Sequence, residues 1–390
     1  MKSVDVKNHL ELITRGAEEI IGIEDIEEKI SAGKKLRVKF GADPTAPELH
    51  LGHAVVMEKL RQFQELGHTV FFIIGDFTAL VGDPSGRTAE RPVLTPEEVA
   101  ESVKGYERQV FKILDREKTE LLHNSVWIEK LGTKGLIELA SEYTVARMLE
   151  RNDFSQRYGA GNPISISEFL YPLLQGYDSV EVRSDIEIGG TDQKFNLLVG
   201  RDFQRNRGQM PQAILTMPLL EGTDGVRKMS KSYGNHIAIE APPSEMFGKI
   251  MSVSDKMMVR YYALLTREKE AEVKNLHPME AKKRLAGLIV ERYHGSAAAE
   301  AAKEEFEKVF SEGQAPEDMP VYSLKSPKRV VDIIYESGLL ESKASVKRYI
   351  GQGGVSFEGE KITEIGALLQ PGTNGVLKIG KRKFLRVSDE

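Results

Sequence analysis

Two histidines stand three residues apart at the predicted junction of a strand and a helix. His50 and His53 flank Leu-Gly in ELHLGH (48–53), which follows LRVKFGADPTAP and precedes the apolar-periodic run AVVMEKLRQFQELG. A spacing of three places both imidazoles on one face of a helix. From the pair alone four roles stay open: metal ligands, acid–base catalysts, phosphate contacts, or polar residues that cap the helix.

The surroundings of the pair favour an anion over a metal ion. The chain contains no cysteine, and no cluster of Glu and His with zinc-like spacing lies nearby in the sequence. Gly52 has no side chain, so a flat or bulky ligand can approach the backbone there. The start of a helix also attracts negative charge.

A second candidate is RKMSKS, residues 227–232, in a polar segment flanked by glycines after an apparent strand. Lys228 and Lys231 are three residues apart, and on a mobile loop both can reach one polyphosphate. The alternative is an ordinary exposed basic loop, which is the usual meaning of such a cluster.

A third candidate is a polar stripe in FLYPLLQGYDSVEV (169–182). Tyr171, Gln175 and Asp178 follow the spacing i, i+4, i+7, so they share one face of a predicted helix. Among Leu and Val, such a stripe lines a pocket or else faces solvent. Pro172 predicts a kink in this helix.

The elements around these residues predict an α/β fold with a mainly parallel sheet. Residues 36–40 alternate as in a strand, 54–67 carry a helical stripe, and 69–77 form an apolar run typical of a buried parallel strand. Further strands are predicted at 180–188 and 212–220. Ligands bind at the carboxyl ends of strands in such sheets, so we expect His50 and His53 near a ligand crevice.

Composition and charge limit the classes of function. The 390 residues predict two or three domains, and no run approaches the roughly 18 apolar residues of a membrane span. The N-terminus lacks a signal-peptide core, and the absence of cysteine fits a reducing cytoplasm. We expect a cytoplasmic protein with no membrane or DNA partner.

The net charge of −5 argues against a generally basic nucleic-acid binder, but it is unevenly spread. Residues 325–390 contain twelve Lys/Arg and eight Asp/Glu, a balance of +4, so the rest of the chain carries −9. A basic tail on an acidic body suggests a division of labour.

Taken together and in this order, HLGH and KMSKS resemble the paired signatures of class I aminoacyl-tRNA synthetases. The polar-stripe segment, GDFTALVGDPSGR, IGGTDQKFNLLVG and the C-terminal segment resemble the bacterial tyrosyl-tRNA synthetase family. The similarity is greatest to the branch that reads KFGADPTAPELHLGH with an intact KMSKS, and it covers nearly the whole chain.

The resemblance implies an order of domains. A Rossmann-like nucleotide-binding catalytic domain would span 1–240, with an insertion at about 115–165 and the KMSKS loop at 228–232. An α-helical domain would follow over 241–312, then a linker over 313–325. A small α+β, S4-like RNA-binding domain would occupy 326–390.

The resemblance also implies roles for matching positions. Asp178 would accept a hydrogen bond from the substrate phenol. Tyr171, Gln175 and Asp83 would hold the ammonium of tyrosine, with Thr78 nearby. Gln193, with Asp192, would bind the ribose and the amino-acid end, and Asp43 belongs to the loop that meets adenylate and pyrophosphate. ATP would lie against Gly52, Gly190, Asp192 and Lys231. Donors to the reacting phosphates would be His50, His53, Lys228, Lys231, Thr45, Arg87 and Arg91.

The implied reaction joins L-tyrosine to tRNA(Tyr) through tyrosyl-adenylate, with ATP and with Mg²⁺ that arrives on ATP rather than in a dedicated metal site. The resemblance further implies a homodimer that meets through the 115–165 insertion. The basic tail would bind tRNA through Lys328, Arg329, Lys343, Lys347, Arg348, Lys381, Arg382 and Lys383.

Two positions depart from the better-known form of the family. Lys39 stands where a tyrosine often contacts the phenol, and Arg87 replaces a frequent lysine, keeping the charge but changing its geometry. Two rivals stay open: a tryptophanyl-tRNA synthetase, which shares both motifs, and a non-catalytic RNA-binding protein on a synthetase scaffold. The carboxylate of Asp178 favours tyrosine, and the intact histidines and lysines favour an enzyme.

Overall fold

A computed structural model describes residues 6–45, 48–85, 94–268, 273, 275–311, 319–380 and 383–388. The chain divides into two compact units, residues 1–299 and 300–390, and each is described by itself. The first unit contains the predicted α/β sheet and the helices that follow it. The second contains a small mixed α+β fold.

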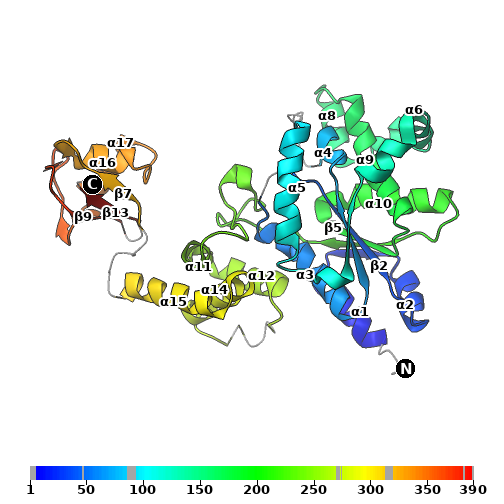
Figure 1. Cartoon of the computed structure of the whole chain (residues 1–390), viewed down its shortest axis with the longest axis horizontal. Helices are drawn as coiled ribbons and strands as arrows, with labels where there is room; N and C mark the ends of the chain where they lie inside the picture. Colours follow the sequence, from blue (N-terminus) through cyan, green and yellow to red (C-terminus); the bar gives the residue numbers. More distant parts are fainter. Residues whose placement is uncertain are drawn as a thin grey trace. The chain divides into compact units, whose positions relative to one another are not determined.

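A six-stranded sheet forms the centre of the first unit, in the order β1-β6-β5-β2-β3-β4 (Figure 1). All neighbouring pairs are parallel except β1 with β6. The mainly parallel α/β fold predicted from the sequence is therefore confirmed. The strands are β1 (Glu19–Ile21), β2 (Arg37–Ala42), β3 (Thr69–Ile74), β4 (Thr119–His123), β5 (Ile186–Gly190) and β6 (Ala213–Met217).

Three helices position the candidate residues against this sheet. Helix α3 (Leu51–Glu65) packs on β3 and β5, and α10 (Lys194–Asn206) packs on β5 and β6. Helix α9 (Ile166–Glu181) lies against α10 over much of its length. A Cβ at Gly176 of α9 would approach Val199 of α10 to 2.8 Å, so only glycine permits this close contact.

The other helices of the first unit surround this layer. Four of them, α11, α12, α14 and the start of α15, belong to the segment predicted to be helical, and α11 and α12 both pack on α14. The bounds are α1 (Val6–Thr14), α2 (Ile23–Ser31), α4 (Thr78–Val81), α5 (Pro96–Val110), α6 (Ser125–Ser141), α7 (Val145–Met148), α8 (Asn152–Gly159), α11 (Pro243–Ser252), α12 (Asp255–Leu265), α14 (Pro278–His294) and α15 (Ser296–Ser311).

The second unit pairs two helices with a five-stranded sheet, in the order β10-β9-β12-β13-β7. Its apolar core joins Val331 and Ile334 of α16 to Leu377 of β12 and Leu385 of β13. The elements are β7 (Val321–Ser323), β8 (Lys328–Arg329), α16 (Val330–Glu336), α17 (Lys343–Gly351), β9 (Val355–Phe357), β10 (Glu360–Lys361), β11 (Leu368–Leu369), β12 (Gly375–Ile379) and β13 (Lys383–Ser388).

The structure differs from the sequence prediction in two places. Residues 180–182, predicted to begin a strand, complete α9 and its C-cap, and the strand starts only at Ile186. Residues Val321–Ser323, placed in the linker, form β7 and pair in parallel with β13. Leu324 is buried in the core of the second unit, because β-sheet pairing outweighs the loop-like composition of this segment.

Four predicted residues lie outside the described part of the chain: Arg87, Arg91, Lys381 and Arg382. Within the described part, no helix is both long and apolar enough to span a bilayer.

Candidate functional site

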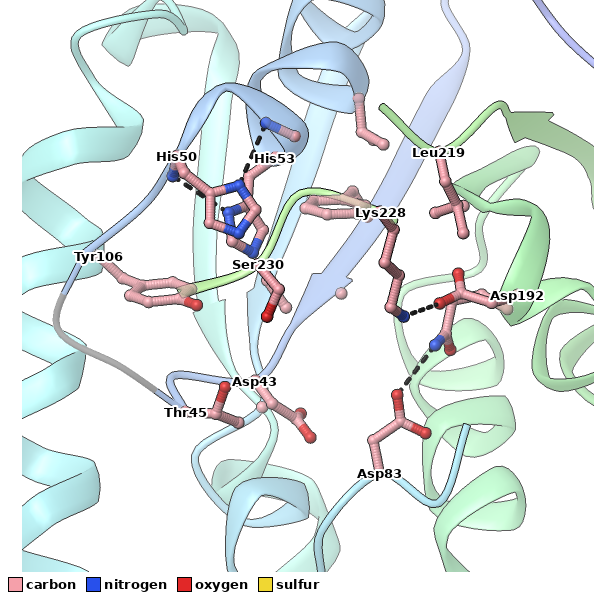
Figure 2. A pocket seen from close by; sticks show the side chains of 18 of the residues that line it. Asp43, Thr45, His50, His53, Asp83, Tyr106, Asp192, Leu219, Lys228 and Ser230 are labelled. Carbon is pink, nitrogen blue, oxygen red and sulfur yellow. Dashed lines mark hydrogen bonds and ion pairs between the residues drawn. The ribbon is translucent and has the colours of Figure 1, made fainter. Parts of the chain in front are cut away.

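A pocket of about 530 Å³ opens at the carboxyl ends of β2, β3 and β5, where the sequence placed a ligand crevice. It gathers residues from the β2–α3 loop, the start of α3, helix α9 and the loop at 228–232 (Figure 2). The predicted residues on its walls are Asp43, Thr45, His50, Gly52, His53, Thr78, Asp83, Tyr171, Gln175, Asp178, Gly190, Asp192, Gln193, Lys228 and Lys231.

His50 and His53 cap the start of α3 reciprocally. The Nδ1 atom of His50 accepts the N–H of Gly52 at 3.1 Å, and Nδ1 of His53 accepts the N–H of His50 at 3.2 Å. The two rings lie 4.0 Å apart between centroids and project into the pocket (Figure 2). From the sequence, capping and ligand contact are alternatives. In the structure both are possible, because Nδ1 of each histidine accepts a capping hydrogen bond and Nε2 remains for a ligand.

Burial keeps both imidazoles neutral. It lowers the pKa of His50 to about 2, with the nearby His53 and His236 adding to the effect, and it lowers the pKa of His53 to about 4. A neutral imidazole whose Nδ1 accepts a hydrogen bond must carry its proton on Nε2. Each histidine therefore offers an Nε2–H donor, and neither is charged at neutral pH.

The two loop lysines reach carboxylates on different walls of the pocket. Lys228 Nζ lies 3.1 Å from Asp192 Oδ2, and Lys231 Nζ lies 3.1 Å from Glu48 Oε2, beside the histidine helix (Figure 2 shows the first pair). Both lysines are partly exposed, so these ion pairs are weak. An anion of greater charge can replace the carboxylate as the partner of each lysine. Glu48 was not predicted from the sequence.

Asn235 binds the backbone of this loop at two points. Its Oδ1 accepts the N–H of Ser230 at 2.8 Å, and its Nδ2 donates to the carbonyl of Lys228 at 3.2 Å and to Asp224 Oδ2 at 3.0 Å. The side chain is buried, which makes these bonds expensive to break. The loop therefore has a defined backbone while its lysine tips remain accessible.

One region of the pocket is rich in carboxylates and amides. Asp43 accepts hydrogen bonds from the hydroxyls of Tyr171, at 2.9 Å, and Thr78, at 2.7 Å. Gln193 donates to Asp83 Oδ2 at 2.9 Å. Burial raises the pKa of Tyr171 well above its usual range, and the charges of Asp43 and Asp83 raise it further. The phenol of Tyr171 therefore stays protonated. This arrangement suits a small cation.

Asn196 joins this region to the polar stripe of α9. Its Nδ2 donates to Gln175 Oε1 at 3.0 Å and to Gln193 Oε1 at 2.9 Å. Asn196 is buried, and the sequence analysis did not select it, although it lies within the segment IGGTDQKFNLLVG.

Asp178 lines a different part of the pocket, where its side chain is almost fully buried. The indole Nε1–H of Trp127 donates to its Oδ1 at 2.8 Å, and Asn124 Nδ2 lies 3.5 Å from its Oδ2. Burial raises the pKa of Asp178 to about 7, while the charge of Lys39 and these two donors oppose the rise. Sequence reasoning missed Trp127 and Asn124, and the only available signal was that Trp127 is the single tryptophan of the chain.

Two predicted glycines leave room for polar side chains. A Cβ at Gly52 would lie 2.9 Å from the ring of His50, and one at Gly190 would lie 2.6 Å from Asp192 Oδ1. Gly75, which the sequence analysis did not select, is tighter still, because a Cβ there would lie 2.1 Å from Asp43 Oδ1. The absence of side chains at these positions keeps the carboxylates and the imidazole in place.

The described residues among those predicted to bind tRNA are distributed over β8, α17 and β13 of the C-terminal unit. Lys343, Lys347 and Arg348 are exposed on α17, although Lys343 Nζ also pairs with Asp332 at 2.7 Å. Lys328 Nζ pairs with Glu336 at 2.6 Å. Arg329 and Lys383 are exposed, and the ammonium of Lys383 donates to the carbonyl of Leu339.

The sequence comparisons agree with this geometry. The model of the family "tRNA synthetases class I (W and Y)" matches residues 31–311. A tyrosine–tRNA ligase of Aquifex aeolicus is 54% identical over 386 residues, which are 98% of each chain. The chain belongs to the tyrosine–tRNA ligase family. Another member, from Thermotoga maritima, is 50% identical over 391 residues and 98% of each chain.

Solved structures of tyrosyl-tRNA synthetases share the fold of this chain. That of Archaeoglobus fulgidus, complexed with L-tyrosine, has a TM-score of 0.62 and 25% identity, covering 77% of this chain and 100% of its own. A C-terminally truncated mitochondrial enzyme of Aspergillus nidulans has a TM-score of 0.66 and 22% identity, covering 80% and 95%. Membership of the tyrosine–tRNA ligase family therefore accounts for the fold of the first unit.

Proposed function

We propose that the chain activates L-tyrosine with ATP and transfers it to tRNA(Tyr). The observation that carries this proposal is the division of one pocket into two parts. Buried Asp178 lies in a dry part suited to a phenol, whereas His50, His53, Lys228 and Lys231 present hydrogen-bond donors suited to polyphosphate. The family of the chain gives the same reaction.

In the first step the tyrosine carboxylate attacks the α-phosphorus of ATP. An oxygen–phosphorus bond forms, the bond between the α-phosphorus and its bridging oxygen breaks, and pyrophosphate leaves. The attacking carboxylate is already ionised at neutral pH, so no general base is needed. What the step requires is alignment and stabilisation of negative charge on the phosphate oxygens.

The histidines and lysines would supply that stabilisation. The Nε2–H groups of His50 and His53 point into the pocket as neutral donors. Lys228 and Lys231 would exchange their carboxylate partners for phosphate oxygens, a substitution favoured by the greater charge of the phosphates. Thr45 also lines the pocket, and Arg87 and Arg91 are proposed to add charge.

Both substrates find matching groups in the pocket. Asp178 would accept the phenol hydrogen. The ammonium would bind among Tyr171, Gln175, Asp83, Thr78, Gln193 and Asp43, and ATP would lie against Gly52, Gly190 and Asp192. No group of three or more His, Asp or Glu suited to a metal lies in the described ranges, and we propose that Mg²⁺ binds through the phosphates of ATP.

The second step transfers tyrosine to the 3′-terminal ribose of tRNA. We propose that the C-terminal unit binds tRNA phosphates through its exposed basic residues and that the reaction takes place in the cytoplasm. We also propose a homodimer that uses the 115–165 segment. Its helices expose Val126, Ile137, Val145 and Tyr158, and Ile166 is exposed just beyond the segment.

ATP–pyrophosphate exchange measured separately with each amino acid tests the proposal. Tyrosine alone should support exchange, and charging of tRNA(Tyr) should require the same protein. Exchange with tryptophan in place of tyrosine would favour the first rival, and the absence of exchange with every amino acid would favour a non-catalytic RNA-binding protein.

A further inference from the structure

Lys39 is buried completely beneath the pocket, yet it does not line it. It lies on β2, and the register of the parallel sheet places it directly opposite Glu187 of β5. Neighbouring residues in register point to the same face of a sheet. The ammonium therefore meets the carboxylate, with Nζ 2.7 Å from Oε1 of Glu187.

The two remaining donors of the ammonium bind helix α9. Lys39 Nζ donates to the carbonyl of Gln175 at 3.0 Å and to Ser179 Oγ at 2.7 Å. Ser179 in turn donates to Glu187 Oε2 at 3.0 Å, so the lysine, serine and glutamate close a ring of polar contacts. A buried ion pair is tolerated when hydrogen bonds complete it in this way.

This ring of contacts fixes the turn of α9 that carries Asp178. Gln175 and Ser179 bracket Asp178, and no other described side chain ties both of these positions to the sheet. Lys39 therefore anchors to the sheet the turn of α9 that carries Asp178.

The ammonium also acts on the charge of Asp178. The charged groups that face this carboxyl are Lys39 from β2 and Glu187 from β5. Tyr171 faces it from the same helix, and Trp127 and Asn124 contribute hydrogen bonds without titrating. The effect of the lysine exceeds that of the glutamate, so the pair as a whole favours the carboxylate.

We propose that Lys39 is a positioning residue for tyrosine selection, which holds the Asp178 turn against the sheet and places a positive charge near its carboxylate. This inference rests on the proposed function and deepens it. Lys39 does not replace the phenol contact that a tyrosine makes elsewhere in the family. It acts through the backbone of Gln175 and through the charge of Asp178, and Asp178 remains the residue that contacts the substrate hydroxyl.

The test removes both charges at once. Lys39→Met alone leaves Glu187 buried without a partner, so the main variant is Lys39→Met with Glu187→Gln. Ser179→Ala is the milder variant, because it breaks a link to α9 and keeps both charges. The matched control is Arg157→Met with Glu168→Gln, which removes another buried ion pair that involves α9 at a point away from Asp178.

Three readouts distinguish positioning from simple stabilisation. In ATP–pyrophosphate exchange the double variant should raise the tyrosine KM by roughly 10-fold or more with a smaller change in kcat, and should reduce selection against phenylalanine. The pH at which kcat/KM falls on the acid side should move to a higher value, because the lysine lowers the pKa of Asp178 more than the glutamate raises it. Ser179→Ala should raise KM less and leave this pH unchanged.

The third readout needs no substrate. Trp127 is the single tryptophan and donates to Asp178, so its fluorescence should titrate with Asp178, with a midpoint near the pKa of about 7. Asp178→Asn should abolish this titration and thereby identify its source. The midpoint should rise in the double variant and stay unchanged in the Arg157/Glu168 control.

The outcomes separate this inference from the proposed function. Wild-type exchange with tyrosine tests the function, and fluorescence tests the link from Lys39 to Asp178 even if exchange fails. The inference is overturned if the folded double variant matches the control in tyrosine KM, selectivity and fluorescence midpoint. If the double variant does not fold, unchanged tyrosine KM in folded Ser179→Ala overturns it.

Discussion

The Nδ1 atom of His53 accepts the backbone N–H of His50 at 3.2 Å, so the second histidine of the pair caps the first. Because Nδ1 is occupied, the proton of each neutral ring lies on Nε2 and faces the pocket. The same contact that starts α3 thus sets the tautomer of a predicted phosphate donor.

His50→Asn should separate capping from catalysis. Asparagine is a good N-cap residue, so folding should be retained, but the Nε2–H donor is lost. We expect kcat for adenylate formation to fall by roughly 10²–10³ with little change in tyrosine KM. His50→Ala should add a loss of about 1 kcal/mol in unfolding free energy, measured in denaturant. Full kcat in the asparagine variant would show that the donor is not used.

Lys231→Ala should act mainly in the transition state of activation. Loss of one donor to the reacting phosphates predicts a fall in kcat of roughly 10²–10³ in pyrophosphate exchange, with tyrosine KM almost unchanged. A large rise in tyrosine KM at normal kcat would contradict this role.

Glu48→Gln is the matched control for that lysine. It removes the partner that holds Lys231 before ATP binds, with Nζ 3.1 Å from the carboxylate. The ATP KM should then fall by about two- to fivefold, since an exposed pair is weak and the competing carboxylate is gone. An increase in ATP KM would show that Glu48 assists binding instead.

Asp178→Asn should increase the stability of the protein and decrease its activity. Asp178 has a pKa of about 7 in the folded state against 3.8 in the unfolded chain. Between these values the folded state binds the extra proton, so wild-type stability falls as pH rises from about 4 to 7. The variant should lack this fall and, above pH 7, be more stable by on the order of 1–4 kcal/mol.

The same Asp178→Asn variant should lose tyrosine activation and most of its selection against phenylalanine. Tyrosyl-tRNA synthetase is known to reject phenylalanine by about 10⁵. Unfolding in denaturant from pH 4 to 8, set beside exchange with each amino acid, measures both effects. Parallel stability curves for the two proteins would refute the raised pKa.

Removal of residues 319–390 should separate charging from activation. The cut must precede β7, because a chain ending at Leu324 would keep a strand without its partner β13. We expect pyrophosphate exchange to persist, whereas tRNA charging and the salt dependence of tRNA binding should decrease sharply. Equal losses of exchange and charging would instead indicate that the C-terminal unit stabilises the body of the enzyme.

The sequence alone determined the elements with strong local patterns. The apolar run that became β3, the helical stripe of α3 and the polar stripe of α9 were read correctly, because burial on one or two faces leaves a periodic signal. The histidine and lysine motifs were also found, since ligand-binding loops follow strands in this fold class. Residues 180–182 and β7 were misassigned because short segments carry too few side chains to show a period.

Only the tertiary structure decided which groups meet. Trp127 and Asn124 lie far from Asp178 along the chain, and the ring of Lys39, Ser179 and Glu187 joins two strands and a helix. No local pattern encodes such contacts, because they depend on strand register and helix packing. Burial then alters the pKa of Asp178, so the charge on which tyrosine selection depends is a property of the folded chain.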